Sequence, residues 1–159
     1  MGKYAEKTDV SCERSQAEIR AIIGRYGATR YATLDEPGRA AIMFEVQDRR
    51  IRFTLPLPNI TDKQFDYDGR NSFRSVEARH RVWEQACRQR WRALALAIKA
   101  KLEAVETGIA TFEEEFLNYI VLPDGVTVGE FIRPQIEVAY SKGVMPKMLP
   151  GIGETGPAN

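Results

Sequence analysis

The segment between Ser75 and Thr107 constrains the fold of this chain more than any other, because it contains neither glycine nor proline. Residues that favour helices dominate it, so we expect one helix over about 75–107, about 48 Å long at roughly 1.5 Å per residue. Apolar residues recur on one side of this helix at helical spacing: Trp83, Cys87, Trp91, Leu94, Ile98 and Val105. Basic residues recur on roughly the opposite side: Arg81, Arg88, Arg92 and Lys99.

The length of this helix also predicts assembly. The chain has 159 residues, and its other segments are too short to cover the whole apolar side. We therefore expect a homo-oligomer, a dimer or larger, formed through the long helix, since two-fold dimers are the commonest assembly. The alternative is that the short helices after residue 111 fold back over the apolar side.

The segments before the long helix predict one helix and a small antiparallel sheet. Ser15-Gln16-Ala17-Glu18 matches a capping box, so a first helix opens there and ends at Gly27. Residues 40–46 and 50–55 read as a hairpin with its corner at Asp48-Arg49, and 31–34 could add a third strand. Residues 59–74 fit no period, which indicates either a functional loop or a mobile surface loop.

The segments after the long helix predict shorter helices. Thr111 can cap a helix over 112–120, and Thr127 can cap a last helix that stops at Gly143 and is kinked at Pro134. The fold class is therefore α+β and rich in helix: an N-terminal helix, a short antiparallel sheet, the long helix and shorter C-terminal helices. We expect a single domain over residues 1–150 and a flexible tail over 151–159.

Composition narrows the function classes. Lys and Arg total 23 against 22 for Asp and Glu, so the chain is neither a strongly basic nor a strongly acidic protein. The single histidine, His80, reads as a surface residue, and Cys12 and Cys87 stand 75 positions apart, too far for a CxxC motif. We therefore expect no catalytic residues, no metal site and no cofactor. Free thiols, a polar start and the absence of a membrane-spanning run predict a cytoplasmic protein without membrane contact.

Two arginines one helical turn apart are the strongest candidates for a binding site. Arg88 and Arg92 can converge on one anion, and arginine suits phosphate because its planar fork binds two oxygens. The loop before the helix adds Phe65 and Tyr67 for stacking and Asn71 for a base or ribose edge. Together these residues are the parts of a nucleotide pocket. The alternative is that the basic side is only a solvated face.

Several segments together resemble a widespread family of small proteins from phages and prophages. They are residues 17–20 and 25–28, Arg49 to Pro58, Glu84 to Arg92, Lys99 to Glu106, and Met145 to Gly151. The chain looks like the first Thoeris anti-defence family, whose members are non-enzymatic, oligomeric sponges for cyclic ADP-ribose signals. The resemblance implies ligand contacts from Arg88, Arg92, Asn71 and Phe65, with Tyr67 and Phe73 as alternatives for the aromatic position.

Three functions follow as hypotheses. The first is a phage-encoded counter-defence protein in the host bacterial cytosol, which binds and sequesters a cyclic nucleotide signal without cleaving it. The second is a phage nucleic-acid-binding accessory protein whose basic stripe follows a phosphate backbone, although the near-zero net charge predicts only weak binding. The third is a protein inhibitor of a host defence enzyme.

Overall fold

A computed structural model describes Ala5 and residues 7–144. Its elements follow the order α1 (Cys12–Arg25), β1 (Arg30–Glu36), β2 (Arg39–Val46), β3 (Arg49–Pro56), η1 (Lys63–Phe65), α2 (Val76–Glu106), α3 (Phe112–Phe116), η2 (Leu117–Tyr119) and α4 (Val128–Lys142). This confirms the expected α+β class. The expected tail over 151–159, the domain boundary at 150 and the Met145 to Gly151 segment lie outside the described residues.

The three strands form an antiparallel sheet in chain order, β1-β2-β3. Side chains of β2 alternate between buried and half-buried, and its buried set is Ala40, Ile42, Phe44 and Val46. The third strand is confirmed and is longer than expected. The hairpin corner predicted at Asp48-Arg49 is wrong by one residue: Val46 pairs with Arg49, and Gln47 and Asp48 form the turn with φ of 50° and 59°. Both turn residues take the left-handed conformation that such tight hairpins require.

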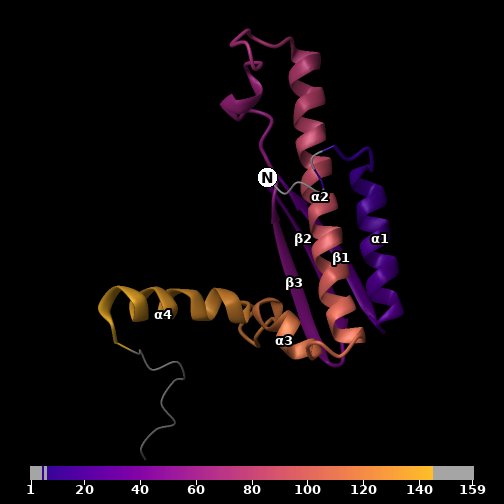
Figure 1. Ribbon diagram of the computed structural model, residues 1–159, viewed down its shortest axis with the longest axis vertical. Coiled ribbons are helices and arrows are strands. Elements are labelled where there is room, and N and C mark those ends of the chain that lie inside the picture. The colour runs from indigo at the N-terminus through magenta and orange to yellow at the C-terminus, as the bar shows by residue number, and fades with distance from the viewer. Residues whose placement is uncertain (1–4, 6, 145–159) are drawn as a thin grey trace, which may run out of the picture.

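The long helix α2 packs on one face of this sheet, with α1 beside it (Figure 1). Ser75 caps its N-terminus by accepting a hydrogen bond from the backbone N–H of Ala78, so the helix begins close to the predicted position. Its apolar side is buried at Cys87, Trp91, Ala95, Ile98 and Leu102. The sheet, α1 and α3 of the same chain cover this side, so the length of α2 does not by itself require a second copy. Assembly through α2 stays a prediction.

The start of α1 corrects the sequence analysis. Ser11, not Ser15, is the N-cap, and its hydroxyl accepts from the backbone N–H of Arg14. Ser15 lies inside the helix with none of its surface exposed. The reason is packing: the helix extends one turn further because Cys12 and Ser15 continue the buried side that Ile19 begins.

The C-terminal helices begin where the sequence places them. Thr111 and Thr127 each form a full capping box, and Gly143 ends α4 in the left-handed conformation with φ of 62°. The helix expected over 112–120 is shorter, because the backbone tightens into a 3₁₀ turn over Leu117–Tyr119. The last helix continues through Pro134 as one element. None of its residues is buried, and it projects from the rest of the described structure (Figure 1).

Candidate functional site

The structure places the two predicted arginines along the contact between α1 and α2. Arg88 donates two hydrogen bonds, from Nε and Nη2, to the Gln85 side-chain oxygen at 3.0 and 2.6 Å. Arg92 donates from Nη1 to the carboxylate of Glu18 on α1. Both arginines are half-buried rather than on an open basic face, because α1 lies against them. An anion can therefore bind these two arginines only by sharing or replacing their present partners.

A residue near the start of the chain, Thr8, contacts α2 beside Arg88. The Gln85 amide nitrogen donates to the backbone oxygen of Thr8 at 3.0 Å. Cys12 and Cys87 lie on either side of the same junction, and Arg88 acts electrostatically on both thiols. Burial raises the pKa of Cys87 to about 11, so this thiol stays protonated at neutral pH and is a poor nucleophile.

The loop over 59–74 is more ordered than its sequence indicates. Trp83 of α2 donates from Nε1 to the backbone oxygen of Pro58 at 2.8 Å, and Arg79 pairs with Asp66 at 3.2 Å. One Asp68 carboxylate oxygen accepts from the backbone N–H groups of Arg70 and Ser72, which lowers the pKa of this carboxyl. These contacts fix the loop beside the N-terminal turns of α2 (Figure 1).

The remaining predicted site residues lie in this loop. Phe65 ends η1 and is only 3% exposed, so its ring anchors the loop in this conformation. Asn71 is exposed and has φ of 60° in a turn where its N–H donates to the backbone oxygen of Asp68. Tyr67 and Phe73 form an exposed edge-on pair with ring centres 5.5 Å apart. The structure thus places the four predicted residues in two neighbourhoods along α2, two in each.

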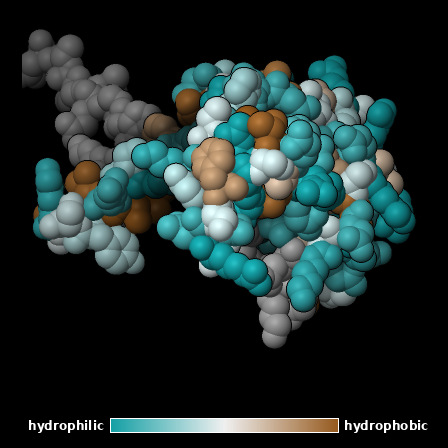
Figure 2. All heavy atoms as spheres, turned by 90° about the horizontal axis from the view of Figure 1, so that it is seen from above, coloured by the Kyte–Doolittle hydropathy of each residue, from teal (hydrophilic) through white to brown (hydrophobic). Residues whose placement is uncertain are grey.

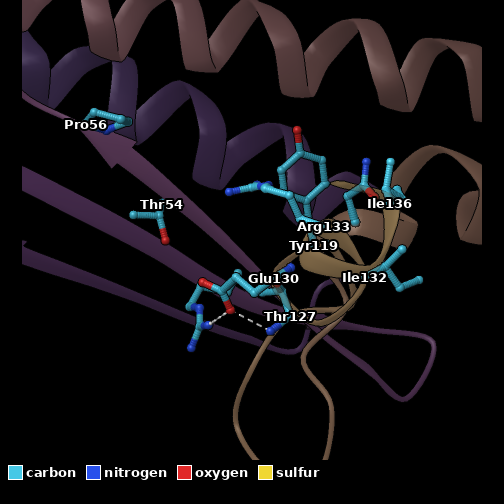
Figure 3. Close-up of a pocket in the computed structure, with 11 residues that line it drawn as sticks. Thr54, Pro56, Tyr119, Thr127, Glu130, Ile132, Arg133 and Ile136 are labelled. Atoms are coloured by element: carbon cyan, nitrogen blue, oxygen red, sulfur yellow. Dashed lines mark hydrogen bonds and ion pairs between the residues drawn. The ribbon is translucent and has the colours of Figure 1, made fainter. Parts of the chain in front are cut away.

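The sequence analysis did not predict a concavity that lies between β3, η2 and the start of α4 (Figure 3). Its β3 residues lie on the outer face of the sheet, the face that points away from α1 and α2. Its volume is about 580 Å³, and its lining includes Arg52, Thr54, Tyr119, Ile132, Arg133 and Ile136. Arg52 donates to Glu130 at 2.6 Å and to the Gly125 backbone oxygen at 2.9 Å. The pKa of Glu130 is lowered first by its bond from the Thr127 N–H, then also by Arg52. We call this concavity the α4 groove.

No local pattern could have found the α4 groove. The Arg52–Glu130 pair joins residues 78 positions apart, and each of them has an ordinary local explanation. Arg52 stands at an outward position of an alternating strand, and Glu130 completes the capping box that Thr127 begins. The packing of the start of α4 against η2 brings them together.

Comparison of the chain with protein-family models, with curated proteins and with solved structures found no match. Among the described residues, no helix is both long enough and apolar enough to span a membrane. The described part of the chain likewise holds no group of three or more His, Cys, Asp or Glu residues placed to bind a metal ion.

Proposed function

We propose that this protein is a phage counter-defence protein that binds a cyclic ADP-ribose type signal in the host bacterial cytosol and retains it without cleavage. The observation that carries the proposal is the pair Arg88 and Arg92, half-buried one helical turn apart between α1 and α2. The likeness to the first Thoeris anti-defence family supports the same residues.

The two arginines suit a pyrophosphate for a physical reason. The side-chain partner of Arg88 is the neutral amide of Gln85, so that bond leaves its positive charge uncompensated. Arg92 already donates one hydrogen bond to a carboxylate oxygen, which a phosphate oxygen can replace. Partial burial strengthens both contacts, because less water competes for the charges. The expected ligand therefore carries two linked anionic groups.

The loop over 59–74 supplies the groups that would recognise the rest of a nucleotide. Phe65 is buried in the present conformation, so stacking of its ring on a ligand requires the loop to open. Tyr67 and Phe73 are exposed and already form an aromatic pair, and Asn71 stands between them in the chain. Movement of this loop toward the arginines would bring both neighbourhoods onto one ligand.

The structure gives less support to the nucleic-acid alternative. Arg81 and Lys99 are exposed, but Arg88 and Arg92 between them are half-buried against α1. A phosphate backbone that follows the helix therefore meets a discontinuous row of charge. We expect weak, salt-sensitive binding of oligonucleotides without sequence preference.

Calorimetric titration with cyclic ADP-ribose, followed by denaturation of the complex and mass spectrometry of the released ligand, tests the proposal. We expect recovery of the intact ligand. Each of Arg88→Ala and Arg92→Ala should weaken binding about 10- to 100-fold, since a charge-assisted hydrogen bond contributes roughly 1.5–3 kcal/mol. Asn71→Ala should weaken it less, and the exposed Arg14→Ala on α1 is the matched control. Release of a cleaved product, or unchanged affinity in both arginine variants, would contradict the proposal.

A further inference from the structure

The last helix, α4, has an apolar surface that the described structure leaves open. It has no buried residue, and Phe131, Ile136, Val138 and Tyr140 are 39, 44, 38 and 89% exposed. At 100° per residue the apolar side chains occupy a broad arc, whereas Glu130, Arg133, Glu137 and Ser141 gather on the other side. Figure 2 shows hydrophobic residues on the segment that projects from the body. An exposed apolar arc of this kind marks an interaction surface.

The outer face of the sheet is also left open by the described residues. The long helices α1 and α2 pack on the opposite face (Figure 1), where Ile42 and Phe53 point inward. The strand register sets two neighbouring rows across the outer face, in which Arg52 is the charged member: Ala32, Met43 and Arg52, then Leu34, Ala41 and Thr54. Leu34 is 48% exposed. Within residues 7–144, no helix covers this face of the sheet.

The α4 groove leads onto this face. A smaller hollow of about 260 Å³ is lined by Leu34, Ala41, Arg52, Thr54 and Glu130, among others. The last three of these residues also line the α4 groove, so the two concavities are continuous. Ile132 and Ile136 of α4 form the opposite wall (Figure 3). The space between the helix and the sheet is thus open to an incoming segment.

Contacts at the start of α4 tie it to β3 and to the segment around η2. Arg52 holds Glu130 at 2.6 Å, and the Val128 N–H donates to the Ile120 backbone oxygen at 2.9 Å. Gly129 lies so close to η2 that a Cβ atom there would stand 2.9 Å from the Asn118 carbonyl oxygen. These contacts fix the direction in which the helix leaves the body. Rotation of α4 onto the outer face of its own sheet would break them.

We propose that α4 of a second copy of this chain occupies the α4 groove and the outer face of the sheet. The chain carries both halves of one contact, a helix without a sheet and a sheet face without a helix. A two-fold axis satisfies both halves at once, because each copy gives its helix and receives the other. The charged groups of the outer face are paired within the chain, Arg39 with Glu36 and both Arg30 and Arg50 with Glu45, so they need no partner from the second copy. This assembly does not depend on the proposed ligand.

Light scattering of the full chain at micromolar concentration tests the proposal. The parent should have twice the chain mass of 18.0 kDa. Ile136→Glu and Tyr140→Glu should each weaken dimerisation by at least about tenfold, since each places a charge in an apolar contact. Circular dichroism should show that both variants stay folded, because neither side chain is buried. Val82→Glu is the control, a similarly exposed apolar residue on α2.

Disulfide capture between two tagged copies tests the arrangement itself. One copy carries Leu34→Cys and the other Ile136→Cys, and each is also mixed with the parent chain as a control. We expect a cross-link only in the mixture of the two variants. A monomeric parent, a dimer that Val82→Glu disrupts while the α4 variants do not, or failure to cross-link would each overturn the proposal.

Discussion

Arg92 of α2 donates a hydrogen bond to the carboxylate of Glu18 on α1, and this ion pair joins residues 74 positions apart in the chain. The two side chains are 23 and 33% exposed, so the pair is partly shielded from water. This ion pair links α1 to α2 at the proposed ligand site. Arg92 therefore has a structural partner that any anionic ligand must meet.

Glu18→Gln should separate the two roles of Arg92. Removal of the competing negative charge should tighten the binding of cyclic ADP-ribose, whereas Arg92→Ala should weaken it and also lower the free energy of unfolding by about 1 kcal/mol. A double-mutant cycle in calorimetry and urea denaturation measures the coupling in each process. Equal affinity in the parent and Glu18→Gln would show that the ligand does not contact Arg92.

Phe116→Ala should destabilise the fold by about 3–5 kcal/mol, the usual cost of a truncated core aromatic. Phe116 has none of its surface exposed, and its ring meets Phe44, Phe53 and Phe112 with centres 4.6 to 6.4 Å apart. Its neighbour Leu117 is 49% exposed, so Leu117→Ala is the matched control and should change stability by less than about 1 kcal/mol. Denaturant unfolding at equilibrium gives both values.

Two helical glycines should respond oppositely to alanine. Gly24 of α1 has no neighbouring atom within 4 Å of an added Cβ, so Gly24→Ala should stabilise the protein by about 0.5–1 kcal/mol through helix propensity. A Cβ added at Gly129 of α4 would stand 2.9 Å from the Asn118 backbone oxygen, so Gly129→Ala should displace α4 despite the same gain in helix propensity. Amide hydrogen exchange should show faster exchange over α4 in Gly129→Ala alone. Unchanged exchange there would mean that α4 is not held closely against η2.

Stability should fall with rising pH between about 9 and 11 because of Cys87. Burial raises the pKa of its thiol from 9.0 to about 11 in the folded state. Above pH 9 the unfolded chain releases this proton while the folded chain retains it, so the free energy of unfolding decreases as pH rises and levels off above the folded pKa. Cys87→Ala should show a shallower decrease than the parent in urea titrations across this range. Parallel curves would contradict the assigned burial.

Helix ends were predictable where one residue decides them locally. Ser75, Thr111 and Thr127 each cap a helix through their own hydroxyl, and Gly143 ends one through its left-handed backbone. The start of α1 was not predictable in this way, because Ser11 and Ser15 can both cap a helix. Burial against α2 decides between them, and that contact joins segments far apart in the chain.

The candidate site likewise has one part that local spacing predicts and another that depends on contacts between distant segments. That Arg88 and Arg92 share one side of a helix follows from their spacing, and the structure confirms it. Their partners do not follow from spacing, because Glu18 reaches Arg92 from another helix. The burial of Phe65 and the ordered turn at Asn71 depend on how the loop packs against α2. The ligand-binding roles of all four residues stay predictions.

The chain order of the sheet has a consequence for how the molecule forms during synthesis. Strands β1, β2 and β3 pair with their sequence neighbours through short turns, so they can associate as soon as they leave the ribosome. Helix α1 is made first, yet the surface it packs on belongs to α2. The 75 residues between Ile23 and Ile98 take about 4–15 s to translate at bacterial and eukaryotic rates. The contact between α1 and α2, where Arg88 and Arg92 lie, therefore joins segments made at well-separated times and cannot form before α2 is complete.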